Sequence, residues 1–412
     1  MAVRCTEREI IARGENLMAV RHLKLRGTNR EIGRRIAELA VQRHGLKPEH
    51  VVQGSRLWSR ARRSYFERNY PIHVQRSAGV ADALGFDPCD DRIDTTTVGT
   101  HYFPLVPPAC SVVWYPPCAT ANGNGFLSRN YDFSTGSLAA LLGVPVPPSS
   151  VTSLPSAMAD TYVMEIYPED GGYPSLYLTG IEILSGCPDG INSEGLVVAL
   201  MQDGGIPADP CQQAGVGLAD YQVLRLLLDT CRTTAEAKEA LLLNKRYYTY
   251  VPCHFLVADR QGKAFVYENS AGRNAEFIID LPDQPQVVVN HPVHRYATPA
   301  DFPDHPASPA AAHSFTRCRS LLSVIENHQG KFSLESLKEI NSLVFFDDRA
   351  AAFYQDSCWP VRTLWHSIYD SQSIRLDVSF YLRDEPDPGR GTAKALRSDY
   401  ISFQLEVNEK GR

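Results

Sequence analysis

The sequence predicts an α+β fold in which helices cover the outer faces of antiparallel sheets. Three observations support this prediction. Strand pairs joined by tight turns occur at 109–133, 250–268 and 363–381. Segments with a helical period separate these hairpins. Neither a GxGxxG nor a Walker pattern occurs at a strand-to-helix turn, which argues against a doubly wound parallel sheet.

The first 109 residues are expected to be largely helical. Thr28 and Glu31 fit a capping box, and Ile32, Ile36 and Leu39 then fall on one helical face. A glycine at position 45 is suited to end this helix. Further helices are expected at 57–70 and 72–84, and an irregular, proline-rich loop is expected at 87–108.

A hairpin at 109–133 begins the rest of the chain. Residues 111–115 are β-branched and aromatic and favour a strand, which Pro116-Pro117 ends. Asn122 to Gly125 is a strong turn signal, and 126–133 forms the second strand. After the hairpin the sequence predicts a loop at 143–156 and strands at 161–167 and 176–184. A turn at 192–195 is followed by a further strand that ends at 202. Two helices are then expected at 221–228 and 234–243, the second capped by Thr234.

The last third of the chain continues the alternation of strands and helices. A second hairpin pairs 250–258 with 263–268 through the turn at 259–262. A short apolar strand at 286–290 ends on an asparagine. The remaining predictions are a loop at 299–312, helices at 316–326 and 334–344, a third hairpin at 363–370 and 373–381, and an exposed charged tail at 385–398.

Composition limits the classes of function. The chain has 412 residues and a net charge of −6, with acidic and basic residues interspersed. No basic surface suits nucleic acid and no apolar run reaches membrane-spanning length, so we expect neither partner. Ten cysteines are too sparse for a disulfide scaffold, and the first residues lack a signal-peptide core, which favours the cytoplasm. No Cys/His cluster has zinc spacing, so no metal is expected.

Ala109 and Cys110 place a cysteine after a small residue at the start of a predicted strand. Such a cysteine is most often a small buried hydrophobe. It could instead be a nucleophile if the bond before it were cut, because the freed α-amine, with a pKa of roughly 7.7–8.0, could serve as the base of the thiol. The thiol would attack the Ala109 carbonyl, and water would cleave the resulting thioester. Cys118 is a weaker rival, because a proline precedes it.

Several polar residues could assist this chemistry. Asn290 and Gln202 each end an apolar strand and could stabilise an oxyanion, although each could also be a polar residue at a strand end. Arg129 and Asp132 could fix the new amine or a substrate carboxylate, or they could form a salt bridge. Arg317 is either a substrate contact or a charge on a helix surface.

These segments together resemble the N-terminal nucleophile (Ntn) hydrolases of the penicillin acyltransferase and choloylglycine hydrolase group. The resemblance is closer to the acyl-coenzyme A:isopenicillin N acyltransferase branch. That family opens its nucleophile segment with Cys-Ser/Thr and closes it on Gly-Arg-Asn-x-Asp. Ser128 stands where the family has the glycine. The matching segments are Cys110-Ser111, SRNYD at 128–132, GINSEGLVV at 190–198, VADRQGKAFVYE at 257–268, VVVNHP at 287–292, SFTR at 314–317 and TLWHSIYD at 363–370.

The resemblance implies an αββα sandwich that cuts itself between Ala109 and Cys110. Residues 1–109 would form a propeptide or small α subunit, and 110–412 a larger β subunit that stays bound to it. In that scheme Cys110 is the nucleophile, and a linear amide, non-peptide or short-peptide, is the substrate. Arg129, Asp132, Asn290 and Gln202 would assist, with glutamine at 202 a departure from the asparagine of the bile-salt enzymes. Arg317, Tyr131 and Phe126 would contact the substrate, with core packing the alternative for the two aromatic residues.

The sequence is compatible with several partners and with two competing functions. The resemblance implies a small-molecule amide or acyl donor, no bound cofactor, and acyl-CoA as a co-substrate of the transferase reaction; self-association into a homo-oligomer is left open. Loops at 134–160 and 203–215 are expected to line the substrate pocket. One alternative is a catalytically inactive binding or partner protein with this fold. A weaker one is a cysteine peptidase with a separate histidine base, for which no histidine motif is found.

Overall fold

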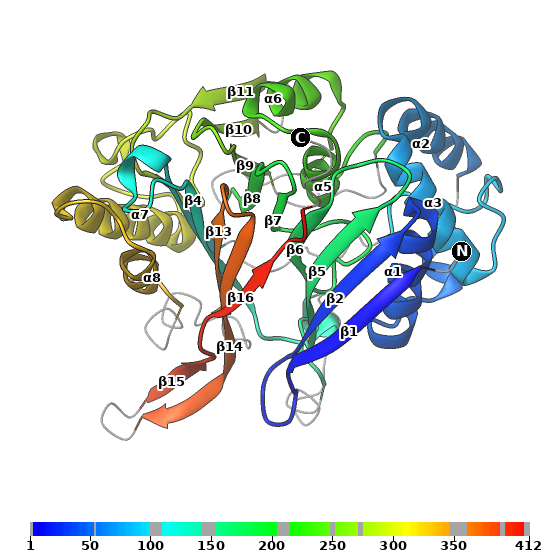
Figure 1. Ribbon diagram of the computed structural model, residues 1–412, viewed down its shortest axis with the longest axis horizontal. Helices are drawn as coiled ribbons and strands as arrows, with labels where there is room; N and C mark the ends of the chain where they lie inside the picture. Colours follow the sequence, from blue (N-terminus) through cyan, green and yellow to red (C-terminus); the bar gives the residue numbers. More distant parts are fainter. Residues whose placement is uncertain are drawn as a thin grey trace.

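The computed structural model describes residues 3–52, 55–98, 109–141, 154–203, 215–247, 252–270, 275–346, 361–387 and 392–407. Two sheets stack face to face between two layers of helices (Figure 1). The described part of the chain therefore forms the predicted α+β sandwich with αββα layers. Most of the predicted loop at 143–156, and the predicted loop residues 99–108 and 204–214, lie outside the described residues.

One sheet has nine strands in the described residues. Its spatial order is β1 (Arg4–Ile11), β2 (Ala19–Gly27), β5 (Asp160–Pro168), β6 (Ser175–Thr179), β7 (Asp189–Asn192), β8 (Val197–Gln202), β9 (Cys253–Ala258), β10 (Ala264–Ser270) and β11 (Ala275–Asp280). On its outer side lie α1 (Asn29–Arg43), α2 (Arg56–Asn69), α3 (Pro71–Leu84), α5 (Asp220–Thr230) and α6 (Thr234–Leu243) (Figure 1).

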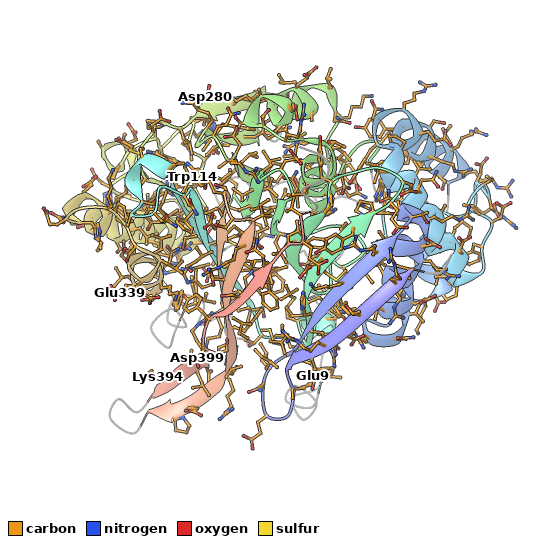
Figure 2. The ribbon with its side chains drawn as sticks, viewed as in Figure 1. Glu9, Trp114, Asp280, Glu339, Lys394 and Asp399 are labelled. Carbon is orange, nitrogen blue, oxygen red and sulfur yellow. The ribbon has the colours of Figure 1, made fainter. Side chains whose placement is uncertain are left out.

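The second sheet has seven strands in the described residues. Its order is β12 (Gln286–Val288), β3 (Ala109–Tyr115), β4 (Phe126–Ser134), β13 (Val361–Asp370), β14 (Arg375–Asp387) and β15 (Thr392–Arg397), with β16 (Ile401–Gln404) paired to β14. Helices α7 (Pro309–Asn327) and α8 (Leu334–Ser342) lie on its outer side, and the short α4 (Leu138–Leu141) follows β4 (Figure 1). The end of β14 and β15 project from the sandwich, as Lys394 shows (Figure 2).

Three apolar clusters fill the spaces between the four layers. One joins the two sheets, with Val112 of β3 and Leu256 of β9 among its members. A second packs the nine-stranded sheet against its helices, and a third packs β3 and β4 against α7 and α8. Because alternate residues of a strand point to opposite faces, each inner strand contributes side chains to two of these clusters. This explains why β3 and β4 are buried along their whole lengths.

Residues 4–27 correct the prediction that the N-terminal part is largely helical. They form the hairpin β1–β2, and β2 pairs in parallel with β5 in the register Ala19 to Asp160. Leu23 and Leu25 alternate with polar residues and are fully buried, which is the period of a strand. The helices predicted after them are present, and the Thr28–Glu31 capping box forms as expected.

Four other element predictions need correction. Helix α6 is capped by Thr233 and not by Thr234, since the Thr233 hydroxyl accepts from the Glu236 amide. Helix α7 begins at Pro309 within the predicted loop, because Ser308 caps it and a proline suits the first helical turn. Strand β6 ends at Thr179, short of the predicted end at 184. The charged tail at 385–398 contributes to β14 and β15, and strands β7, β11 and β16 were not predicted from the sequence.

A buried ion cluster joins α3 to α5. Arg76 donates to both carboxylate oxygens of Asp229, at 2.5 and 3.0 Å, and Arg225 donates to the same group at 2.6 Å. The Tyr70 hydroxyl also donates to Asp229. Both arginines hold the pKa of the Asp229 carboxyl below its ordinary value despite burial. The cluster fixes the helices before residue 109 onto the rest of the fold.

Candidate active site

Cys110 lies at the start of β3, opposite Tyr131 of β4 in the antiparallel register. Its side chain belongs to the apolar cluster between the two sheets, and only 5% of the residue is exposed. Alternation along β4 puts Arg129 and Tyr131 on the same side as the thiol. An Arg129 Nη atom lies 3.5 Å from the Cys110 Sγ.

The backbone of Cys110 is held on both sides of its Cα. Its N–H donates to Asn290 Oδ1 at 2.7 Å, and its carbonyl oxygen accepts from Arg317 at 2.7 Å. Arg317 also donates to the same Asn290 oxygen at 2.7 Å. The Asn290 amide nitrogen donates to the Gln202 carbonyl at 2.6 Å, so this side chain bridges the two sheets. The site therefore fixes the nitrogen atom that a cut before Cys110 would turn into an amine.

Asp132 lies on the other side of β4, toward α7. Its carboxylate accepts from the Thr363 hydroxyl at 2.5 Å and lies 3.4 Å from Arg317. Burial raises the pKa of Asp132 to about 6, against the opposing effect of Arg317. The register places Asp132 directly across from Ala109, the residue before the predicted cut. The Ala109–Cys110 peptide thus runs beside a carboxyl and a guanidinium.

Arg129 is fixed by a partner that the sequence analysis missed. It forms a fully buried ion pair with Asp189 of β7 and donates to the Leu200 carbonyl at 2.7 Å. Trp365 and Tyr369 also donate to Asp189. These bonds tie β4 to the opposite sheet directly beneath the thiol. Asp189 precedes the predicted turn at 192–195 and was assigned to no element, so no pattern in the sequence marked it as a site residue.

Burial raises the pKa of the Cys110 thiol, although the positive charge of Arg129 opposes this. The thiol of the uncut chain is therefore protonated near neutral pH. A thiol in this condition needs a base before it can act as a nucleophile. Among the described residues, no histidine is hydrogen-bonded to Cys110, so the geometry does not favour a Cys–His peptidase site.

The predicted substrate contacts divide into three cases. Arg317 is buried in the third turn of α7 and holds the backbone of Cys110. Tyr131 borders the thiol and stacks on Trp365, with ring centroids 4.0 Å apart. The placement of Phe126 corrects the prediction, because this residue lies at the turn end of β4, about 17 Å along the strand from Tyr131, in the cluster under α7 and α8.

Gln202 and Ser128 are the two departures from the expected pattern. Gln202 supplies its backbone carbonyl to Asn290, and its side chain makes no hydrogen bond among the described residues. The expected oxyanion role of this side chain stays a prediction. Ser128 faces away from Cys110, and its hydroxyl bonds with Asn341 and His366 at 2.9 and 2.8 Å. Serine in place of glycine therefore does not alter the surroundings of the thiol.

Cys118, the rival nucleophile, lies at the opposite end of β3. It is exposed in a short 3₁₀ helix, and its thiol lies 3.3 Å from the Asp283 carbonyl oxygen. Within the described residues, no group of three or more His, Cys, Asp or Glu side chains is arranged to hold a metal ion. In the same part of the chain, every helix is too short or too polar to cross a membrane.

A second acidic residue that sequence analysis missed is Glu182, in the turn after β6. It is 0% exposed, and its carboxylate has no side-chain hydrogen-bond partner among the described residues. Burial raises the pKa of Glu182 to about 7, and the charge of Asp189 adds to the shift, while the backbone amides of Glu182 and Gly180 and the charge of Arg129 oppose it. A lone charge inside the apolar run 176–184 was the available signal, but it was read as part of a strand.

The raised pKa of Glu182 predicts that the stability of the folded chain depends on pH. The folded state holds the Glu182 proton more tightly than the unfolded chain, so its contribution is present below pH 4.5 and is lost as the pH rises through 7. Glu182→Gln lacks this loss. The free energy of unfolding of Glu182→Gln minus that of the natural chain should therefore increase by up to about 3 kcal/mol between pH 4 and pH 8. Urea unfolding at both pH values measures this, and parallel pH profiles of the two proteins would contradict it.

The two stacked sheets and the helices on their outer faces form the αββα sandwich of the N-terminal nucleophile hydrolases. The family model of acyl-coenzyme A:6-aminopenicillanic acid acyl-transferase matches residues 118–382, which is more than half of the chain. The chain belongs to this family. The matched range contains Arg129, Asp132, Asn290 and Arg317 and begins after Cys110.

Solved structures of two related enzymes are similar to this chain. A mutant of conjugated bile acid hydrolase from Clostridium perfringens shares 14% identity, with a TM-score of 0.44 over 73% of this chain and 99% of that chain. Penicillin V acylase from Agrobacterium tumefaciens shares 15% identity, with a TM-score of 0.40 over 66% of this chain and 82% of that chain. A search of curated proteins finds no match.

Proposed function

We propose that this protein is a self-processing cysteine amidase or N-acyltransferase that acts on linear amides through Cys110. One observation carries the proposal. The amide nitrogen of Cys110 is held 2.7 Å from the Asn290 oxygen, while its thiol points between the sheets beside Arg129. The N–H of a cysteine in a core strand is ordinarily paired with a backbone carbonyl, and not with a side-chain oxygen that a buried guanidinium also contacts. Membership of an acyl-transferring family supports the same function.

The proposed first step is a cut between Ala109 and Cys110. The Cys110 sulfur attacks the Ala109 carbonyl carbon, the carbon–nitrogen bond breaks, and the nitrogen takes up the thiol proton. Water then hydrolyses the thioester, which leaves a carboxylate on Ala109 and a free amine and thiol on Cys110. Asn290 and Arg317 keep the nitrogen and carbonyl of Cys110 in place through these steps.

The mature site would then work on substrates with the same groups. The α-amine of Cys110 takes the thiol proton, and the thiolate attacks the amide carbon of the substrate. The amine of the substrate leaves with a proton, and a thioester remains on Cys110. Water or a second amine resolves this thioester. We propose a non-peptide or short-peptide linear amide as substrate, and acyl-CoA as an alternative acyl donor in the transferase reaction.

The mass of the purified protein tests the proposal. Two fragments that together account for the chain should be found, and the larger one should begin with Cys110. After incubation with an amide donor, the larger fragment should gain the mass of the acyl group. An active preparation that consists of one uncut chain would overturn the proposal, as would a larger fragment that begins at Cys118.

The choice between hydrolase and transferase depends on the fate of one intermediate. We expect the first burst of released amine, about one per enzyme, to be the same with and without an amine acceptor, because both reactions share the acylation step. Only the products should change, from free acid toward new amide. Quenched-flow measurement with product analysis checks this, and a burst that requires the acceptor would contradict a shared thioester.

The two fragments are expected to stay together after the cut. Strand β2 pairs along its length with β5, and the buried Arg76–Asp229 cluster ties α3 to α5. Both contacts join residues before 109 to residues after it. Size-exclusion chromatography of the cut protein should therefore give one peak that contains both fragments, and separate elution without denaturant would be the contrary result.

A further inference from the structure

The backbone of Asn290 is held by Ser314 of α7, a residue that takes no part in the proposed bond changes. Asn290 lies beyond the end of β12 at Val288, and its backbone N–H donates to the Ser314 hydroxyl oxygen at 3.0 Å. Both residues are buried. A buried N–H group that lost this acceptor would be left without a hydrogen bond, which is costly. Ser314 therefore fixes the backbone from which the Asn290 side chain reaches Cys110.

One face of α7 holds Asn290 at two points. Ser314 and Arg317 are three residues apart on this helix, so they lie on the same face. Ser314 accepts from the backbone N–H of Asn290, and Arg317 donates to the side-chain oxygen of Asn290 at 2.7 Å. That same oxygen accepts from the N–H of Cys110, also at 2.7 Å. A change at Ser314 would therefore displace the group that holds the nitrogen of the bond to be cut.

His291 determines the direction of the Ser314 hydroxyl. Its Nδ1 lies 2.9 Å from the Ser314 oxygen, and burial lowers the pKa of His291 to about 3, so the ring is neutral. The hydroxyl oxygen accepts from Asn290, and its own proton needs an acceptor, which among the described residues is the unprotonated Nδ1. The ring proton is then on Nε2. A neutral His291 in this form keeps a lone pair of the Ser314 oxygen directed at Asn290.

We propose that Ser314 is a positioning residue of the Cys110 site and that His291 orients its hydroxyl. The inference rests on the proposed function, because it adds a residue to the same reaction. The nitrogen of Cys110 must stay within reach of the thiol proton while its bond to Ala109 breaks. Because misplacement by about 1 Å can cost on the order of 100-fold in rate, we expect loss of the Ser314 hydroxyl to slow the cut by about 10- to 100-fold.

Time courses of self-cleavage test the inference without a substrate. The full chain is synthesised in a cell-free extract, and conversion of the uncut chain to two fragments is followed on a gel. Ser314→Ala should cut about 10- to 100-fold more slowly than the natural chain. Ser128→Ala is a matched control, because the Ser128 hydroxyl is also buried and also contacts a histidine, His366, but faces away from Cys110. The control should cut at the natural rate.

Two substitutions at His291 distinguish positioning from a general loss of stability. His291→Asn keeps an acceptor at the place of Nδ1 and should retain most of the cleavage rate. His291→Gln moves the acceptor one bond further out and should cut as slowly as Ser314→Ala. Loss of packing alone predicts the opposite order, because the smaller asparagine leaves more empty space beside Phe302 and Phe315. This pair of variants decides the question even if Ser314→Ala fails to fold.

The outcomes separate this inference from the proposed function. If the natural chain cuts before Cys110 and folded Ser314→Ala cuts at the same rate, the inference alone is overturned. Slower cleavage by His291→Asn than by His291→Gln would also overturn it and leave the proposed function intact. A folded natural chain that never cuts would overturn the proposed function and the inference with it.

Discussion

Cys110→Ala is expected to yield a single uncut chain of 45.8 kDa without amidase or transferase activity. The variant lacks the sulfur that attacks both the Ala109 carbonyl and the substrate, so cleavage and turnover should each fall by about 10³-fold or more. The side chain removed is small and lies in an apolar cluster, so the fold should persist. Intact-mass measurement and a donor assay give the two readouts.

The matched control for this change is Cys118→Ala. Cys118 is exposed and lies at the far end of β3, so its loss should leave the cut and the activity unchanged. A Cys110→Ala protein that still divides before residue 110, or that still consumes donor at the natural rate, would contradict the proposed mechanism. Circular dichroism of both variants confirms that the comparison is made between folded proteins.

Arg129→Met is expected to lower the unfolding free energy by about 3–5 kcal/mol. The change leaves Asp189 as a buried carboxylate that has lost its paired cation. It also removes the guanidinium beside the Cys110 thiol, so the pKa of that thiol should rise further. Urea unfolding measures the first effect, and the pH dependence of Cys110 labelling measures the second.

Two controls distinguish the effect of breaking this buried ion pair from the effect of removing a positive charge elsewhere. Arg232→Met breaks an exposed pair with Glu236 on the surface of the chain and should cost no more than about 0.5 kcal/mol. Adding Asp189→Leu to Arg129→Met removes the stranded carboxylate and should recover part of the lost stability. If Arg129→Met is no more destabilising than Arg232→Met, the pair is not the tie between the sheets that its burial indicates.

Elements with a complete local signal could be predicted from the sequence. The hairpin at 109–133, the capping box at Thr28 and the hairpin at 363–381 each carry turn residues or caps at the right spacing, and all three are present. Strand β2 has the alternation of a strand, but its partner β1 is an exposed edge strand with charges on both faces and lacks this alternation, so the N-terminal hairpin was missed. Its structure depends on pairing with a distant segment, which no local pattern records.

The residues of the candidate site also divide into those that a local sequence pattern predicts and those that only the three-dimensional structure identifies. Cys110, Arg129, Asp132 and Asn290 sit in recognisable segments, and the structure brings all four together. Asp189 and Glu182 come from the opposite sheet and its turn, and their roles follow only from three-dimensional contact. Phe126 shows the reverse error, because membership of the right strand does not place a side chain at the right end of it.

The parallel pairing of β2 with β5 also bears on how the mature protein can be produced. A gene that begins at codon 110 would supply the nucleophile with its amine but would leave the edge of β5 without its neighbour. That strand is apolar and buried over most of its length, and such an open edge promotes aggregation. Recombinant expression of the larger fragment alone should therefore give insoluble material, which co-expression of residues 1–109 should rescue.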